Sequence, residues 1–337
     1  MPQLRLTVSV ERLEFSAPFR IAGFLFEHQD AVVVSLEDTA GHRGRGEASG
    51  VFYLDDNVPR MIESIEAQRA AIERGIDRGA LQRLLPPGGA RNAIDCALWE
   101  LDAERSGQPV WALAGLDAPH PLVTTFTLGA DEPAVMAAGA RRWAQARALK
   151  VKLTGDPELD RARIASVRAA RPDVWLGVDA NQAYTMERLP VLLEALLEAR
   201  VELLEQPLAR GREADLESFT SAVPIAADES ALSLSDLAGL VGRFDIVNIK
   251  LDKCGGLTEA LAMARGARRL GLGLMVGNMM GSSLAMAPAF LLGQLCSVVD
   301  LDGPTFLAHD RTPGVRYREG KIECDAAVWG SPRRATS

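Results

Sequence analysis

The sequence predicts an α/β protein, a (β/α)₈ barrel preceded by a smaller α+β domain. Up to about residue 50 the apolar residues alternate as they do in the strands of an antiparallel sheet. From residue 121 onward, eight short apolar runs alternate with segments of helical periodicity, which is typical of repeated β–α units. The length of 337 residues is large for one ordinary domain and suits a barrel with one appended domain.

The predicted N-terminal domain contains strands followed by helices. Residues 5–15 (RLTVSVERLEF) and 30–38 (DAVVVSLED) have the alternation of strands. Residues 58–76 have helical periodicity, and PPGGA at 86–90 then breaks the chain. A strong amphipathic helix is expected over residues 91–107, before the alternation of short apolar runs and helical segments begins.

The barrel strands are predicted from eight apolar runs. The runs begin near residues 121, 149, 174, 201, 224, 245, 272 and 297. A doubly wound sheet is the alternative, but the glycine-rich phosphate fingerprint that often follows its first strand is missing from the sequence. We therefore expect an N-terminal domain over residues 1–115 and a barrel over 116–303, with residues 304–337 folding back on the N-terminal domain.

Composition and charge exclude several classes of protein. The formal net charge is 37 − 45 = −8 without a basic cluster, which argues against a nucleic-acid partner. No apolar run reaches membrane-spanning length and the N-terminus lacks the apolar core of a signal peptide, so we expect a cytoplasmic protein without a membrane partner. The scattered cysteines, without a CxxC pair, indicate neither a disulfide framework nor a zinc knuckle.

Acidic residues end three consecutive predicted strands, with one carboxylate on each. They are Asp179 in VDAN, Glu205 in LLEQP and Asp228 in AADES. Because functional groups of a barrel gather at the carboxyl ends of its strands, these side chains should lie close together. Oxygen ligands without histidine or cysteine suit a hard cation, and favour Mg²⁺. Each acid alone could instead cap a helix or hold a loop, but three in succession favour a metal site.

Three lysines flank these acids and suggest proton transfer. Lys150 and Lys152 are two residues apart on the second predicted strand and so face the same way, while Lys250 ends the sixth strand. One lysine would remove the α-proton of a carboxylate substrate and another would return it to the opposite face, with neighbouring cations lowering the lysine pKa. The alternatives are an edge strand with solvated lysines, and a buried salt bridge of Lys250 with Asp252 or Glu229.

This ordered set of motifs resembles the enolase superfamily, and within it the muconate-lactonizing-enzyme subgroup. The resemblance covers nearly the whole chain, and it is carried by GRGEAS (44–49), ARNAIDCALWELDAERSGQPVWALAG (90–115), KVK, DAN, EQP, ADES and NIKLDKCGG. It implies a modified TIM barrel with an N-terminal α+β capping domain, and one Mg²⁺ per subunit. It also implies that Lys152 and Lys250 are the acid/base pair, that Lys150 is an auxiliary lysine, and that the three acids are the metal ligands.

The eighth predicted strand indicates the substrate. Asp300 and Asp302 in VVDLDG are two residues apart and would face the same way, which suits an ammonium group. This pair resembles the DxD feature of dipeptide epimerases, so we expect a dipeptide substrate, and the family resemblance implies a homo-oligomer. The alternatives are an N-acylamino acid racemase, an o-succinylbenzoate synthase-like or a muconate cycloisomerase-like enzyme, and a non-catalytic metal-binding barrel.

Further residues are expected to line the substrate site. Phe24 lies where L-Ala-Glu-specific relatives place an arginine, which favours a hydrophobic second residue, although Glu27 or Asp55–Asp56 could attract a cationic one. Asn278 ends the seventh strand, and Met280 stands where many relatives carry a polar group. Other polar residues that end strands are Asn181, Glu229 and Asp252.

Overall fold

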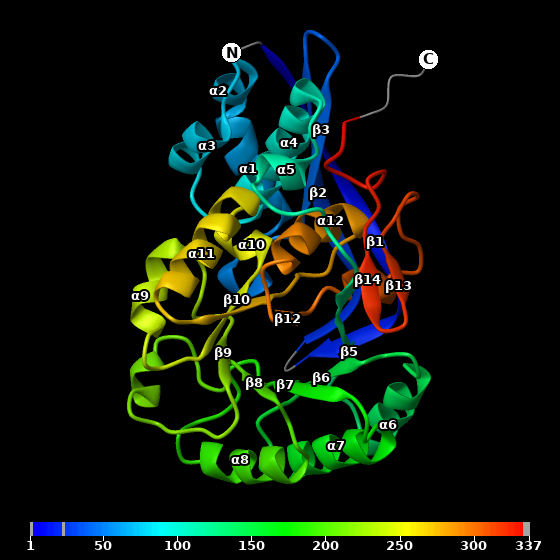
Figure 1. Cartoon of the computed structure of the whole chain (residues 1–337), viewed down its shortest axis with the longest axis vertical. Helices are drawn as coiled ribbons and strands as arrows, with labels where there is room; N and C mark the ends of the chain where they lie inside the picture. Colours follow the sequence, from blue (N-terminus) through cyan, green and yellow to red (C-terminus); the bar gives the residue numbers. More distant parts are fainter. Residues whose placement is uncertain (1–2, 22–23, 333–337) are drawn as a thin grey trace.

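An antiparallel sheet forms the N-terminal part of the chain in the computed structural model, which describes residues 3–21 and 24–332 (Figure 1). Its strands lie in the order β1-β2-β3, and they are β1 (Leu4–Ile21), β2 (Phe24–Asp38) and β3 (Arg43–Ala48). Alternate residues of β2, including Val32, Val34 and Leu36, are buried in the core of this domain. The alternation of apolar residues in the sequence therefore corresponds to the alternate burial of side chains along this strand.

Helices pack on this sheet and complete the predicted α+β capping domain. The described elements are the 3₁₀ turn η1 (Phe52–Leu54) and the helices α1 (Val58–Ala67), α2 (Arg69–Glu73), α3 (Arg78–Leu84), α4 (Gly89–Ser106) and α5 (Val110–Leu113). The region of helical periodicity over residues 58–76 forms two helices that are divided at Gln68, where the backbone leaves the helical region. A Cβ at Gly46 would lie 2.0 Å from the carbonyl oxygen of Ala93, so α4 can lie directly on β3 only because this position is glycine.

Eight parallel strands form the barrel, which confirms the predicted fold class. The sheet order β12-β11-β10-β9-β8-β7-β6-β5 places each strand beside its neighbour in the sequence. The strands are β5 (Thr125–Leu128), β6 (Ala148–Lys152), β7 (Trp175–Asp179), β8 (Leu203–Glu205), β9 (Ile225–Ala227), β10 (Ile246–Ile249), β11 (Gly273–Val276) and β12 (Val298–Val299). The register sets Lys152 opposite Asp179 and Asp179 opposite Glu205, so polar strand ends lie side by side.

Helices and 3₁₀ turns connect the barrel strands. They are α6 (Pro133–Arg142), α7 (Pro157–Ala170), α8 (Leu189–Glu198), η2 (Glu213–Leu216), η3 (Leu234–Asp236), α9 (Leu237–Leu240), α10 (Leu251–Cys254), α11 (Leu257–Arg269), α12 (Ser283–Gly293) and η4 (Gly303–Phe306). Figure 1 shows α6, α7 and α8 at the end of the molecule farthest from the capping helices. Among the described helices, none combines the length and apolarity needed to cross a membrane.

The run predicted as the first barrel strand is divided between two sheets. β4 (Leu122–Val123) pairs with the tail strand β14 (Lys321–Glu323), which also pairs with β13 (Arg316–Arg318), and only β5 enters the barrel. Thr124, between β4 and β5, is buried. Its hydroxyl group donates to the carbonyl oxygen of Val299 at 3.3 Å and accepts from the N–H of Leu301 at 3.0 Å. This side chain therefore joins the two outer strands of the described barrel sheet.

Buried polar contacts hold the capping sheet on the barrel. Glu47 of β3 accepts a hydrogen bond from the Ser282 N–H at 2.7 Å and pairs with Arg311 of the tail at 3.0 Å. Farther along the tail, the indole N–H of Trp329 donates to the carbonyl oxygen of Arg45 at 2.9 Å. The tail thus contacts the capping sheet as well as β4, while the domain limits given above remain a prediction.

We expect Thr124→Val to destabilise the chain by about 1–3 kcal/mol, because the isosteric side chain leaves a buried N–H and a buried carbonyl without this partner. Urea unfolding would measure the loss, and Thr39→Val in an exposed turn is the matched control, with an expected effect within about 0.5 kcal/mol. Equal unfolding midpoints for Thr124→Val and the wild type would show that this bridge does not hold the barrel.

Candidate active site

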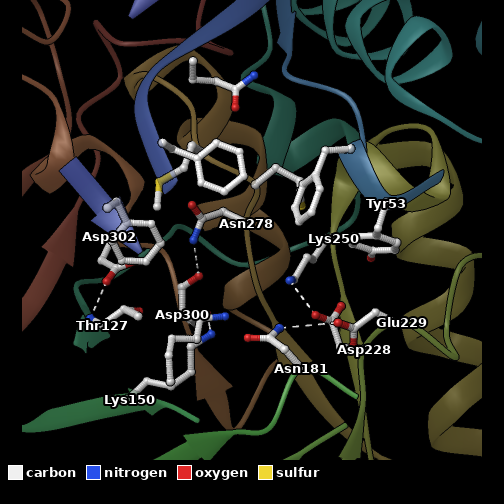
Figure 2. A pocket seen from close by; sticks show the side chains of 17 residues that line it. Tyr53, Thr127, Lys150, Asn181, Asp228, Glu229, Lys250, Asn278, Asp300 and Asp302 are labelled. Atoms are coloured by element: carbon white, nitrogen blue, oxygen red, sulfur yellow. Dashed lines mark hydrogen bonds and ion pairs between the residues drawn. The ribbon is translucent and has the colours of Figure 1, made fainter. Parts of the chain in front are cut away.

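A pocket opens between the carboxyl ends of the barrel strands and the capping domain. Figure 1 shows that the paired ends of β1 and β2 reach down to the barrel, and Figure 2 shows the side chains around the pocket. The lining residues are Phe19, Phe26, Gln29, Phe52, Tyr53, Thr127, Lys150, Lys152, Asn181, Asp228, Glu229, Lys250, Asn278, Met279, Met280, Asp300 and Asp302. The pocket therefore combines a charged floor from the barrel with a largely apolar rim from the capping domain.

The three predicted acids lie together at the strand ends, and Asp228 is the one that lines this pocket. Asp179 ends β7, Glu205 ends β8, and Asp228 directly follows β9, and all three side chains are buried. One carboxylate oxygen from each residue lies within 4.8 Å of those from the other two. The parallel register of neighbouring strands produces this cluster, because strands that end together bring their last side chains together.

Buried lysines flank the acids from both sides. The Nζ atom of Lys152 lies 2.6 Å from Asp179, and that of Lys250 lies 2.7 Å from Asp228. Lys152 comes from β6 and Lys250 follows β10, so the strands that carry the acids, β7 to β9, lie between them. An edge strand with solvated lysines is therefore wrong for Lys150 and Lys152, because both side chains are buried and β6 lies between β5 and β7.

Lys150 has two acidic partners. Its Nζ atom lies 3.5 Å from Glu205 and forms a close ion pair with Asp300. The hydroxyl group of Thr125 also donates to Asp300, at 2.5 Å. Lys150 thus connects the acidic cluster with the predicted ammonium site on β12.

Two further polar residues of the acidic cluster were not predicted. Lys253, the third residue of α10, lies 2.5 Å from Asp228, and its Nζ atom also donates to the carbonyl oxygen of Asn248 at 3.0 Å. The side-chain amide of Asn248 donates to Glu205 at 2.7 Å. Their spacing from Lys250 could have indicated both residues. Asn248 is two residues before Lys250 on the strand and so faces the same way, and Lys253 is one helical turn after Lys250.

The pKa values in the cluster follow from burial and charge. Burial, and then the charge of Asp179, raises the pKa of Glu205 to about 7. Burial alone would lower the pKa of Lys250, but Asp228 and Glu205 outweigh it and raise that pKa above its usual value. The pKa of Lys150 is also raised, because Asp300 and Glu205 outweigh its burial. Among the protein groups, the nearby carboxylates thus outweigh burial and the neighbouring lysines at Lys150 and Lys250, and the lowering of a lysine pKa beside a bound cation stays a prediction.

The two aspartates after β12 both line the pocket, but they differ in their partners. Asp300 pairs with Lys150, whereas Asp302 accepts the backbone N–H of Thr127 at 2.6 Å. Burial, and then the charge of Asp300, raises the pKa of Asp302 to about 6. Asn278 was predicted at the end of the seventh strand. Its side-chain amide donates a hydrogen bond to the carbonyl oxygen of Asp300 at 2.6 Å.

The remaining predicted residues are placed as follows. Asn181 and Glu229 line the pocket beside Asp228, and the Asn181 amide donates to Glu229 at 3.4 Å. Asp252 lies outside the lining and accepts the N–H groups of Ser49 at 2.9 Å and Gly50 at 3.0 Å, so it anchors the capping loop and is not a partner of Lys250.

The rim of the pocket is largely apolar. Met280 lines it next to Met279, and Phe19, Phe26 and Phe52 contribute from the capping domain. The side chain of Phe24, which was expected at this rim, lies outside the described residues. Among the described lining residues, every cation is a lysine of the floor that pairs with a carboxylate.

The acidic cluster fits a divalent metal ion. Three buried carboxylates close to one another form a set of oxygen donors, which hard cations such as Mg²⁺ prefer. Burial, and then the charge of Asp179, raises the pKa of Glu205, and a bound cation would favour its ionised form. Asp179, Glu205 and Asp228 are the residues that would hold the ion.

Two family models match the chain, and together they cover most of it. Residues 4–115 match the mandelate racemase/muconate lactonizing enzyme N-terminal domain, and residues 135–325 match the enolase C-terminal domain-like model. The modified barrel, the capping domain and the acidic cluster at the strand ends agree with this class of enzymes. The chain belongs to the mandelate racemase/muconate lactonizing enzyme family of the enolase superfamily.

Named epimerases are among the relatives of the chain. It is 40% identical over 305 residues to the L-Ala-D/L-Glu epimerase of Escherichia coli, and the match covers 90% of this chain and 95% of that relative. It is 35% identical over 328 residues to the hydrophobic dipeptide epimerase of Roseobacter litoralis, and the match covers 90% of this chain and 91% of that relative.

Solved structures of similar proteins contain dipeptides. An enolase family member from Agrobacterium tumefaciens with bound sodium and L-Ala-L-Glu has a TM-score of 0.93 and 39% identity, and the match covers 97% of this chain and 100% of that chain. The dipeptide epimerase of Enterococcus faecalis complexed with Mg and L-Leu-L-Tyr has a TM-score of 0.90 and 30% identity. This match covers 96% of this chain and 98% of that chain.

We expect Mg²⁺ to raise the melting temperature of chelator-treated protein by a few degrees, because an ion that binds only the folded chain stabilises it. Glu205→Gln should lose this increase. Glu202→Gln, an exposed position on the same segment, is the matched control and should keep it.

The same titration should depend on pH. Because the pKa of Glu205 is raised from 4.5 to about 7, its proton competes with the cation, and Mg²⁺ affinity should fall by up to about tenfold per unit below pH 7. Stability without metal should have the opposite pH dependence, because the raised pKa favours the protonated folded state, and it should fall as the pH rises from 4.5 to 7. Equal Mg²⁺ affinity at pH 5.5 and 7.5, or an unchanged response in Glu205→Gln, would contradict this metal site.

Proposed function

We propose that this chain is a Mg²⁺-dependent dipeptide epimerase that inverts the α-carbon of the C-terminal residue. The observation that carries the proposal is the pair Lys152 and Lys250, which flanks the acidic cluster from opposite sides within one pocket. The similarity to named dipeptide epimerases supports the same reaction.

The two ends of the pocket suit the two ends of a dipeptide. One end carries Asp300 and Asp302, and their negative charge suits the free ammonium group of the first residue. The other end carries the acidic cluster, where a bound cation would attract the substrate carboxylate. A dipeptide that spans these ends would place its second α-carbon near Lys152 and Lys250.

The two lysines supply the proton transfer in this proposal. One removes the α-proton, and the other gives a proton to the opposite face, which inverts the configuration. The base must be neutral to accept the α-proton, so its ion pair with Asp179 or Asp228 has to weaken before the reaction. When bound, Mg²⁺ would stabilise the negative charge that develops beside the substrate carboxylate.

Lys150 stabilises charge and does not move the proton. The ion pair with Asp300 holds the Lys150 side chain in place, and the raised pKa of Lys150 keeps this side chain protonated. A fixed positive charge beside Glu205 stabilises the enolate-like intermediate as negative charge moves onto the carboxylate oxygens.

The apolar rim favours a hydrophobic second residue. Phe26, Phe52 and Met279 line the part of the pocket above the charged floor, and an apolar side chain buried against them is stabilised. A glutamate side chain would bring an unpaired charge to the same surface. The Roseobacter litoralis relative is named for hydrophobic dipeptides, whereas the Escherichia coli relative is named for L-Ala-D/L-Glu.

We expect Lys152→Ala and Lys250→Ala each to abolish epimerisation by at least about 10³-fold while keeping deuterium exchange with one epimer only. The remaining lysine can still take a proton from its own face and return deuterium to it. Proton NMR in D₂O with L,L- and L,D-dipeptides would follow the α-proton of the second residue. Exchange of both epimers by either variant would contradict a two-lysine mechanism.

We expect kcat/KM to be at least about tenfold higher for L-Ala-L-Leu or L-Ala-L-Phe than for L-Ala-L-Glu, because only the apolar side chains are stabilised at the rim. Phe26→Ala should lower kcat/KM for the apolar dipeptides, and Leu54→Ala, outside the pocket lining, is the matched control. A preference for L-Ala-L-Glu would overturn the hydrophobic specificity. A preference for N-acetyl amino acids would favour the racemase alternative.

A further inference from the structure

Tyr53 brings a polar group of the capping domain into the pocket. It lies in η1, and its ring packs edge-on against Phe52 with 5.3 Å between the ring centroids. Phe52 in turn packs against Phe26 of β2, with 5.5 Å between centroids. The aromatic contacts fix the ring, and the Tyr53 side chain lies beside Asp228 and Glu229 (Figure 2).

The hydroxyl group of Tyr53 is buried but has no hydrogen-bond partner among the described residues. A buried hydroxyl without a partner is unfavourable, and native chains usually satisfy such groups. Burial, and then the charges of Asp228 and Glu229, raises the pKa of Tyr53, so the group stays a neutral phenol that can donate. A donor held in this way suits a negatively charged acceptor from outside the chain.

Other polar atoms at this end of the pocket also lack partners. Within the described part of the chain, Asn181 Oδ1 and Glu229 Oε2 are buried and unbonded. At the opposite end, Asp300 and Asp302 both have hydrogen-bond partners, in Thr125 and Thr127. An amide oxygen and an ionised carboxylate only accept hydrogen bonds, so of these three groups the Tyr53 hydroxyl is the donor that suits the carboxylate of the proposed dipeptide.

We propose that the Tyr53 hydroxyl group donates a hydrogen bond to the α-carboxylate of the bound dipeptide. The inference rests on the proposed function and adds a binding residue from the capping domain to the side chains of the barrel. The contact is made to a group that every dipeptide carries. Tyr53 should therefore contribute to affinity for all dipeptide substrates and not to the choice among second side chains.

Tyr53→Phe tests this contact. KM should rise about tenfold or more, because a hydrogen bond to a charged group is lost, while kcat changes less than about threefold, since the bond exists before and during the reaction. The KM increase should be equal for L-Ala-L-Ala, L-Ala-L-Leu and L-Ala-L-Phe. The melting temperature of the substrate-free variant should be unchanged or higher, because the substitution removes an unsatisfied buried group.

Tyr184→Phe is the matched control. The Tyr184 hydroxyl group donates to Asp160 at 2.8 Å and is not part of the pocket lining. Its loss should lower the melting temperature and leave KM unchanged, which is the opposite pattern.

The outcomes separate the inference from the proposed function. A wild-type protein that exchanges no dipeptide α-proton overturns both. An active wild type with the same KM in Tyr53→Phe overturns the Tyr53 contact alone. A KM increase confined to one class of second side chain also overturns it, because the hydroxyl group would then contact that side chain.

Discussion

Three carboxylates buried at one point are the constraint on which the site depends. Asp179, Glu205 and Asp228 could not be buried together as anions unless cations lay beside them. The chain places lysines of β6 on one side and lysines that follow β10 on the other, so each acid has an ammonium partner within 4.0 Å. This balance offsets the cost of burying the cluster, and it also places the two bases of the proposed reaction on opposite sides of the acids.

The capping domain contributes shape and only limited charge to the same site. Its sheet is held by the buried contact of Glu47 with Arg311, and its loop by the hydrogen bonds of Asp252 to Ser49 and Gly50. These contacts fix the rim residues at a set distance above the lysines. In the proposed function, substitutions in the rim could therefore change the accepted second residue while the contacts of the charged floor stay the same.

The sequence predicted the site well where it depends on strand ends, and less well where it depends on contacts between distant segments. The acids and lysines were found because parallel strands bring their last residues together, and period-two alternation shows which way they face. Tyr53 and Phe26 were not found, since their place in the pocket depends on how the capping domain lies on the barrel. The division of the first strand was missed because its tail partner, β14, is almost 200 residues away in the sequence.

The aspartate pair after β12 shows how the two ends of the site are connected. Asp300 is neutralised by Lys150, whereas no lysine or arginine of the described residues pairs with Asp302. An arriving ammonium group would therefore be attracted chiefly by Asp302, and its charge would favour the ionised form of that carboxylate. Because Lys150 also lies 3.5 Å from Glu205, any weakening of its pair with Asp300 changes the charge balance of the acidic cluster. One buried lysine thus couples the Asp300 side of the pocket, where we propose that the ammonium group binds, with the acidic cluster.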